Sequence, residues 1–273
     1  MPDPYAMIAE VDTAVQKRLA EVLELRAADP QQQEMLRAYL SELELPQGAK
    51  ALEIGCGTGA ISRALVELLT LEVHGIDPSP VFVVRARELG GHLAGLTFAE
   101  GDGRSLDLPD ASFDLVVFHT TLCHIPDPEL ALREAFRVLR PDGQLAVFDG
   151  DYTTTSVAIS AFDPLQPLVK AMVAAFVHNP WLVRRLPKTL ASAGFAVQSL
   201  RSYGYTQTSD PAYMLTLIDR GADLLVEVGS LTADSADALR KEAHRRARAG
   251  EFFGHISFVS VIPRRRGPDP VSQ

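Results

Sequence analysis

The sequence has few of the residues that mark several common protein classes. Its 273 residues include only two cysteines, Cys56 and Cys123, and one tryptophan. Two thiols are too few for a disulfide framework, and they fit a reducing cytosol. No stretch approaches the roughly 20 apolar residues that span a bilayer, and the N-terminus lacks a basic region followed by a sustained apolar one. These absences predict a cytoplasmic protein without a membrane partner.

Positive charge is also scarce. The chain has 26 lysines and arginines against 35 acidic residues, a formal net charge of -9. Because no basic face offsets this excess, we do not expect binding to a nucleic acid. Apolar residues make up 47%, enough for one large α/β domain with a substantial core. The run Arg264 to Arg266 opens a predicted flexible tail over 264–273.

Short apolar runs alternate regularly with helical patterns from Ala51 onwards. This alternation predicts β-α-β units and a parallel sheet. The expected strands are 50–54, 71–76, 96–100, 113–118 and 144–149, and the expected helices between them are 59–69, 79–89 and 128–139.

Two amphipathic helices are expected before the first strand, in a segment over 1–47. The first has apolar residues spaced by three or four, namely Ile8, Val11, Val15, Leu19 and Val22. The second begins at Asp29 and Pro30, with Gln32 placed to complete a capping box. We expect these helices to lie across the mouth of a ligand site.

The regular alternation stops after residue 150. Residues 151–192 are interrupted by prolines and show no obvious strand, so an inserted helical cap is expected there. Two late strands are expected at 195–208 and 252–262. Helices are expected between them at 211–227 and 233–249.

The first strand runs into a glycine-rich turn in the stretch "LEIGCGTGA". Gly55, Gly57 and Ala60 have the G-x-G-x-x-A spacing of a dinucleotide site. Glu53 and Gly59 instead fit a nucleoside site without phosphates, in which a carboxylate precedes the first glycine. The turn by itself leaves both ligand classes open.

Two further carboxylates end the next two strands. Asp77, followed by Pro78, is placed to accept both hydroxyls of a ribose. Asp102 lies in a Gly-Asp-Gly turn from which its carboxylate reaches an exocyclic amine such as adenine N6. A helix-capping Asp and a simple polar turn are the structural alternatives. With Glu53, these acids line the expected crevice of an open α/β sheet and favour a nucleoside ligand over NAD.

The stretches "LEIGCGTG", "GIDPSP", "AEGDGRSLDLPDASFDLVV", "LCHIPDP" and "VLRPDGQLAVFD" resemble the class I S-adenosylmethionine-dependent methyltransferases. The resemblance is strong over 48–150 and weak over 193–262. It implies that Asp77 holds the ribose, Asp102 the adenine amine, and the turn the methionine part of S-adenosylmethionine. The implied cofactor residues are Glu53, Gly55, Cys56, Gly57, Gly59, Asp77, Pro78, Gly101, Asp102, Gly103 and His119, with no metal site.

The resemblance also implies the fold. We expect a Rossmann-like three-layer sandwich, with a seven-stranded, mostly parallel sheet whose last strand lies antiparallel between strands five and six. The methyltransferase domain is expected over 48–263. The most similar subgroup comprises small-molecule enzymes, including quinone-biosynthesis C-methyltransferases and natural-product O- and N-methyltransferases. The acceptor atom, oxygen, nitrogen or carbon, stays open.

Two histidines are catalytic candidates. His119 ends the fourth strand and His124 begins the following turn, on the side of the sheet where an acceptor must lie. A histidine near its reference pKa of about 6.5 is suited to remove a proton from a hydroxyl acceptor. A hydrogen-bonded structural histidine is the alternative for each. Other residues expected near the acceptor are Asp149, Asp151 and Tyr152, and, as a lid, Phe176, His178 and Trp181.

Two other functions share this cofactor site. One is a non-methylating reaction, such as a cyclisation, on an S-adenosylmethionine-binding scaffold. The other is a regulatory module that senses the cofactor. A homodimer through the N-terminal helices or the cap is also compatible with the sequence.

Overall fold

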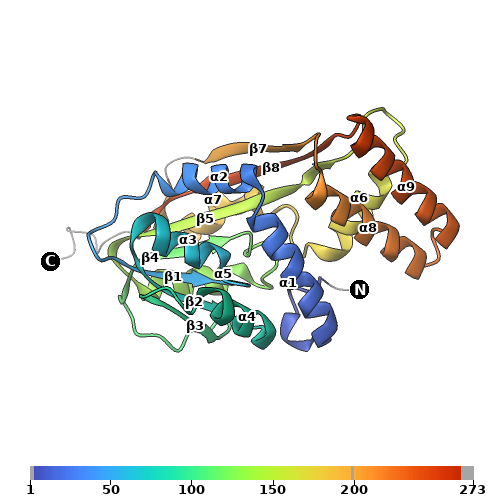
Figure 1. Ribbon diagram of the computed structural model, residues 1–273. Helices are drawn as coiled ribbons and strands as arrows, with labels where there is room; N and C mark the ends of the chain where they lie inside the picture. The colour runs from blue at the N-terminus through green and yellow to red at the C-terminus, as the bar shows by residue number, and fades with distance from the viewer. Residues whose placement is uncertain (1–2, 198–199, 266–273) are drawn as a thin grey trace.

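The computed structural model describes residues 3–197 and 200–265, which form a long twisted sheet flanked by helices (Figure 1). The main path of the sheet has the order β3-β2-β1-β4-β5-β8-β7. Its strands are β1 (Lys50–Ile54), β2 (Glu72–Asp77), β3 (Leu96–Glu100), β4 (Phe113–His119), β5 (Leu139–Ser156), β7 (Arg201–Gln207) and β8 (Gly254–Val261).

The strand directions confirm the predicted fold class. Strands β1 to β5 are parallel to their neighbours, whereas β8 runs antiparallel between β5 and β7. Residues 115–118 of β4 are fully buried, as expected for a central strand covered on both faces. Two short strands, β6 (Phe195–Ala196) and β9 (Arg264–Arg265), lie off the main path.

The crossover helices cover both faces of the sheet. They are α3 (Ala60–Leu69), α4 (Pro80–Gly90) and α5 (Pro128–Val138), each close to its predicted bounds. From β1 the chain adds β2 and β3 on one side, whereas from β4 it adds β5 on the opposite side. Because β-α-β crossovers are right-handed, these opposite directions place α3 and α4 on one face of the sheet and α5 on the other. The change of direction lies between β1 and β4, where open α/β sheets bind ligands.

The N-terminal segment differs in part from the prediction. A short 3-10 helix, η1 (Ile8–Glu10), is followed by α1 (Thr13–Ala27) and α2 (Pro30–Leu40). The break falls at Asp12, whose carboxylate accepts from the Ala14 amide and starts α1. Asp29 caps α2 as expected, but the Gln32 side chain has no hydrogen-bond partner and forms no capping box.

The predicted bounds of the inserted cap need correction. Strand β5 continues through residues 151–156, because they pair antiparallel with β8, as Asp151 does with Ser257. Helix α7 (Leu182–Ser192) packs on β5 and β6 and therefore belongs to a layer of the sandwich. Only α6 (Gln166–Phe176) joins a cap, together with α8 (Ala212–Glu227) and α9 (Ala233–Ala249), beyond one end of β5 and β8 (Figure 1).

Two C-terminal expectations also change. The predicted single strand over 195–208 is divided into β6 and β7, and residues 198–199 lie outside the described part. The predicted tail starts later than 264, because Arg264 pairs with Gln144 of β5 and with Ala196 of β6. The remaining residues of that tail, 266–273, are not described. Among the residues described, no helix is long and apolar enough to cross a membrane.

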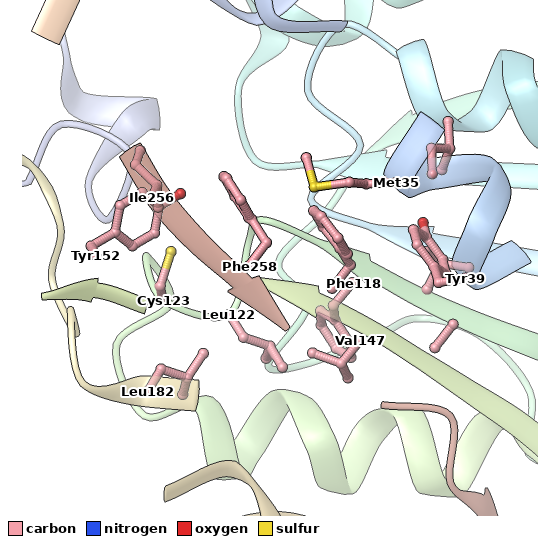
Figure 2. Packing of buried hydrophobic residues seen from close by; sticks show 14 of the residues in the cluster. Met35, Tyr39, Phe118, Leu122, Cys123, Val147, Tyr152, Leu182, Ile256 and Phe258 are labelled. Carbon is pink, nitrogen blue, oxygen red and sulfur yellow. The ribbon is translucent and has the colours of Figure 1, made fainter. Parts of the chain in front are cut away.

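The hydrophobic core joins α2 to the sheet. Buried side chains from α2, β4, β5 and β8 form one cluster, including Tyr39, Phe118, Val147 and Phe258 (Figure 2). The rings of Phe148 and Phe258 stack with centroids 5.2 Å apart, and Tyr39 stacks on Phe148 at 5.3 Å. This packing fixes α2 beside the carboxyl end of β4.

The cap is held together by a close approach of two helices. A Cβ atom added at Gly221 of α8 would lie 2.0 Å from the backbone oxygen of Leu168 in α6. Gly221 is therefore needed for α8 to pack directly on α6.

We predict that Gly221→Ala destabilises the protein by about 1 to 3 kcal/mol, as overpacked sites do. In an unhindered helix the same change would instead stabilise by up to about 1 kcal/mol. Urea unfolding measures the difference, and the exposed Glu227→Ala in the same helix should change stability by less than about 0.5 kcal/mol. If Gly221→Ala were as stable as the original protein, the close packing of α8 on α6 would be refuted.

Candidate functional site

A cavity of about 320 Å³ opens at the carboxyl ends of β1, β2 and β4. The glycine turn after β1 and the acidic ends of β2 and β3 form one side. Residues 5–10, α1, α2, α6 and α8 form the other. The cavity therefore brings together the predicted cofactor residues and the cap.

The glycines of the turn have backbone conformations that other residues adopt only with strain. Gly55, Gly57 and Gly59 have φ angles of 72°, 53° and 77°. A Cβ atom would lie 2.2 Å from Thr121 Cγ2 at Gly55 and 2.5 Å from Phe98 Cζ at Gly59. Both the bend and the close packing thus require glycine at these positions.

Four amide groups of the turn donate hydrogen bonds within the protein. Gly55 and Cys56 donate to the Ile76 carbonyl at 2.8 and 2.9 Å, and Gly59 donates to Cys56. Gly57 donates to Oδ2 of Asp77 at 2.8 Å. A pyrophosphate site needs such N–H groups free to meet phosphate oxygens. The four bonded amides therefore favour a nucleoside over a dinucleotide at this turn.

Cys56 is buried between the glycines and packs with Val83 and Phe98. Burial first, and then the nearby Asp77 and Glu53 charges, raise the pKa of its thiol well above the ordinary value. A thiol held protonated in this way is a poor nucleophile. Cys56 is thus a small packing residue of the turn.

Glu53 is a buried carboxyl group beneath the turn. Its Oε2 accepts a hydrogen bond from the Ser62 hydroxyl. Burial raises its pKa to about 8, although the hydrogen bonds from Ser62 act in the opposite direction. Near neutral pH most of the protein therefore carries an uncharged Glu53.

Asp77 connects the end of β2 to the glycine turn. One carboxylate oxygen accepts from the Gly57 amide and the other from the Ser79 amide at 2.9 Å. Burial raises its pKa to about 6, and the two amide hydrogen bonds limit that rise. Asp77 is thus mainly ionised at pH 7, and it lines the cavity together with Pro78.

Asp102 is more exposed and lines the cavity beside Gly103. Arg104 donates to both its oxygens, at 2.7 to 3.1 Å, and these hydrogen bonds are the main cause of its lowered pKa. A Cβ atom at Gly103 would lie 2.4 Å from Cγ2 of Ile54. Among the predicted cofactor residues, only Gly59 and Gly101 do not line the cavity.

His119 lies in the wall between the cavity and the core. Its Nδ1 is 3.0 Å from the Tyr39 hydroxyl, and its ring stacks on Phe148 with centroids 4.7 Å apart. Burial, assisted by the charge of Arg26, lowers its pKa well below the ordinary value. The imidazole is therefore neutral at pH 7 and a weak base.

His124 has a different environment. Its Nδ1 lies 2.6 Å from Oδ2 of Asp3, and its ring lies 4.8 Å from that of Tyr5. Asp3 is buried and also accepts from the backbone amides of Tyr5 and His178. A carboxylate at Nδ1 favours the tautomer with its proton there, which leaves a lone pair on Nε2.

The other predicted acceptor residues divide into two groups. Tyr152 and Phe176 line the cavity, whereas Asp149, Asp151, His178 and Trp181 do not. Asp149 accepts from the Cys123 and Gly150 amides, and Asp151 pairs with Arg184 at 2.8 Å. These two carboxylates hold the polypeptide in place, so the expectation that they face the crevice is wrong.

Several polar residues of the cavity were not predicted. Arg26 donates to Oγ1 of Thr120 at 2.6 Å. Gln32 is 5% exposed, and within residues 3–197 and 200–265 neither polar atom of its amide has a hydrogen-bond partner. Arg220 lies over the Phe176 ring at 4.4 Å, and its buried Nη2 has no hydrogen-bond partner in the same ranges. The sequence offers no signal for them, because each lies in an ordinary amphipathic helix.

We predict that ionisation of Glu53 makes folding stability depend on pH. Its folded pKa of about 8 lies above the ordinary value of 4.5. Between these values only the folded state holds the proton, so stability falls by up to about 1.4 kcal/mol per pH unit. Above pH 8 the loss is complete.

Urea unfolding from about pH 5 to about pH 9 tests this, because Glu53→Gln cannot titrate. The stability of the original protein minus that of Glu53→Gln should decline up to pH 8 and then level off. The exposed Glu67→Gln in α3 is the matched control and should show no such difference. If the unfolding free energies of Glu53→Gln and the original protein changed in the same way with pH, this would contradict the raised pKa of Glu53.

Comparisons with known proteins agree with this geometry. A family model described as "Methyltransferase domain" matches residues 52–147. An uncharacterised 37.1 kDa protein in transposon TN4556 of Streptomyces fradiae is 31% identical over 82% of this chain and 64% of its own length. The 2-methyl-6-phytyl-1,4-hydroquinone methyltransferase of Synechocystis is 29% identical over 63% of this chain and 54% of its own length. The chain thus spans between 54% and 64% of these two curated relatives.

The fold also has a match among solved structures. A candidate methyltransferase from Bacillus halodurans C-125 superposes with a TM-score of 0.62, at 19% identity, over 85% of this chain and 99% of that one. At this identity the likeness concerns the fold alone. The sheet order, the glycine turn and the matching family model together identify a class I S-adenosylmethionine-dependent methyltransferase domain in this chain.

Proposed function

We propose that the protein transfers a methyl group from S-adenosylmethionine to a small organic acceptor. The observation that carries the proposal is the glycine turn tied to Asp77, with the amides of Gly55, Cys56, Gly57 and Gly59 all hydrogen-bonded within the protein. Such a turn offers few of its own donors to a phosphate, and it keeps the Asp77 carboxylate at the cavity for a ribose. The reaction class follows from the family, and the acceptor is a matter for experiment.

The residues around the cavity fit this cofactor. Asp77 is suited to the ribose hydroxyls, Asp102 to the adenine amine, and the turn from Glu53 to Gly57 to the methionine part. Arg26 donates a hydrogen bond to the Thr120 hydroxyl, and the hydroxyl of the next residue, Thr121, donates to the Gly55 carbonyl. Arg26 is thereby close to the glycine turn. A guanidinium at this place suits the carboxylate of the methionine part. The unpaired amide of Gln32 offers a further polar contact in the same cavity.

The cofactor, when bound, supplies an electrophilic methyl group on a sulfonium. The protein's task is to hold the acceptor atom close to it and to exclude water. Positioning of this kind contributes up to about 7 to 11 kcal/mol. Met172, Phe176 and Leu217 of the cap line the cavity and give it apolar walls. They support an acceptor with an apolar body.

For a hydroxyl acceptor, His124 is the better of the two predicted bases. Asp3 fixes its Nδ1 proton and stabilises the imidazolium that forms when Nε2 takes a proton. His119 is held neutral with a lowered pKa and is bonded to Tyr39. We therefore assign His119 to the wall of the site and His124 to proton removal.

We predict that S-adenosylhomocysteine binds the protein and that Asp77→Ala weakens this binding at least about tenfold, because charge-assisted hydrogen bonds to the ribose are lost. Isothermal titration calorimetry measures the affinity, and circular dichroism checks the fold. Asp77→Asn, which keeps one acceptor oxygen, serves as a milder variant. Asp107→Ala, at an exposed position nearby, should bind like the original protein. Well-folded original protein that binds neither S-adenosyl compound would falsify the proposal.

The reaction itself is tested with methyl-labelled cofactor and a metabolite panel, read by mass spectrometry. Label in a product supports methyl transfer. A product that forms only in the presence of cofactor but carries no label would instead support the non-methylating alternative. Tight cofactor binding without any turnover of a broad panel would favour a sensor.

We predict that His124→Gln lowers kcat for a hydroxyl acceptor from that panel by about 10²- to 10⁴-fold. Asp3→Asn should lower kcat less, because the imidazolium loses its charged partner while Nδ1 keeps a hydrogen-bond acceptor. KM should change little for either variant. His92→Gln, at an exposed position, is the control. Unchanged kcat in His124→Gln would show that the reaction needs no base at this position.

A further inference from the structure

One part of the cavity is distinct from the proposed cofactor site. We define the acceptor chamber as the part formed by Tyr5, Met172, Phe176, Tyr213, Leu217 and Arg220. Its residues come from the N-terminal segment and from helices α6 and α8, none of which belongs to the glycine turn. Arg26 of the proposed cofactor site borders the chamber beside Tyr213. The six residues that define the chamber are mostly apolar and aromatic, and they include one permanent positive charge.

That charge is the guanidinium of Arg220. The Cζ of Arg220 lies 4.4 Å from the centre of the Phe176 ring, and its Nη2 is buried without a hydrogen-bond partner among the described residues. Over residues 3–197 and 200–265, no carboxylate lies within 4.0 Å of it. Burying a guanidinium N–H without an acceptor is costly, so the arrangement indicates that a ligand supplies one.

The acidic residues closest to Arg220 in α8, and the buried Asp3, are already engaged. Asp219 and Asp223 of the same helix both pair with Arg240 of α9. Asp3, two residues before Tyr5, accepts hydrogen bonds from His124 and from two backbone amides. None of these carboxylates neutralises Arg220.

We propose that Arg220 binds a carboxylate of the acceptor, so that the substrate is an acidic molecule with an aromatic or apolar body. This inference rests on the proposed function, in which Arg26 meets the carboxylate of the cofactor. The planar guanidinium matches a carboxylate in a two-point contact. A phosphate group would need more donors than one arginine among apolar walls provides. The rings of Phe176 and Tyr213 suit a flat, apolar body.

The test uses 2-naphthoate and its neutral counterpart 2-naphthamide as probes, on full-length protein saturated with S-adenosylhomocysteine. Dissociation constants come from calorimetry or ligand-observed NMR. We expect the acid to bind at least about tenfold more tightly than the amide, in line with one charge-assisted contact. In Arg220→Gln this preference should fall below about threefold.

Three measurements keep the result specific. Arg220→Lys retains the charge without the planar contact and should keep part of the preference. Arg185→Gln, at an exposed position on α7, should behave like the original protein. The affinity for S-adenosylhomocysteine should stay within about twofold in Arg220→Gln, which also shows that this variant is folded.

The inference is overturned if the two probes bind equally well, if Arg220→Gln keeps the preference, or if neither probe binds while S-adenosylhomocysteine does. Failure of the proposed function gives a different pattern. In that case S-adenosylhomocysteine does not bind the original protein. The preference for 2-naphthoate over 2-naphthamide is then measured on the protein without S-adenosylhomocysteine.

Discussion

The carboxylate of Asp77 is the group on which the geometry of the site depends. Its two oxygens accept the Gly57 and Ser79 amides, and so connect the glycine turn to the end of β2. The turn itself needs three positive φ angles, which only glycine adopts at low cost. Burial works against the charge of Asp77, as its pKa of about 6 shows. The unfavourable burial of this charge is offset because the same carboxylate accepts the amides that fix the turn, and it also faces the cavity.

The acceptor side depends on tertiary contacts between distant segments. Gly221 allows α8 to rest on α6, which brings Arg220 over Phe176. Asp3 reaches His124 across 121 residues of sequence and holds the N-terminal residues against the turn that follows β4. The cavity is therefore closed by three parts of the chain that are independent in sequence. A change in any of them alters the acceptor chamber without touching the glycine turn.

This division explains what the sequence could and could not predict. The strands, the glycine turn and Asp77 follow local patterns, since the pattern of a strand, its turn and its helix lies within about 20 residues. The cap bounds were wrong because β5 is extended by pairing with β8, about a hundred residues away. Asp3, Gln32 and Arg220 carry no local signal, because a buried polar residue is recognised only from what surrounds it. Gln32 and Arg220 lie in helices, and Asp3 precedes the first helix. The expectation for Asp149 failed for the same reason, because one of its two amide partners, Cys123, comes from the turn that follows β4.

Under the proposed function, the distribution of charge around the cavity suits methyl transfer from a sulfonium. A sulfonium loses its positive charge as the methyl group leaves, so a fixed anion beside it would stabilise the ground state more than the transition state. Glu53, beneath the turn, has a pKa of about 8 and is largely uncharged at pH 7. The ionised Asp77 lies at the end of β2, where a ribose is expected, and the cation of Arg220 lies in the cap. Because burial is the main cause of the raised pKa of Glu53, and the charge of Asp77 adds to it, the closed packing of the turn removes an unfavourable charge from the methionine end of the site.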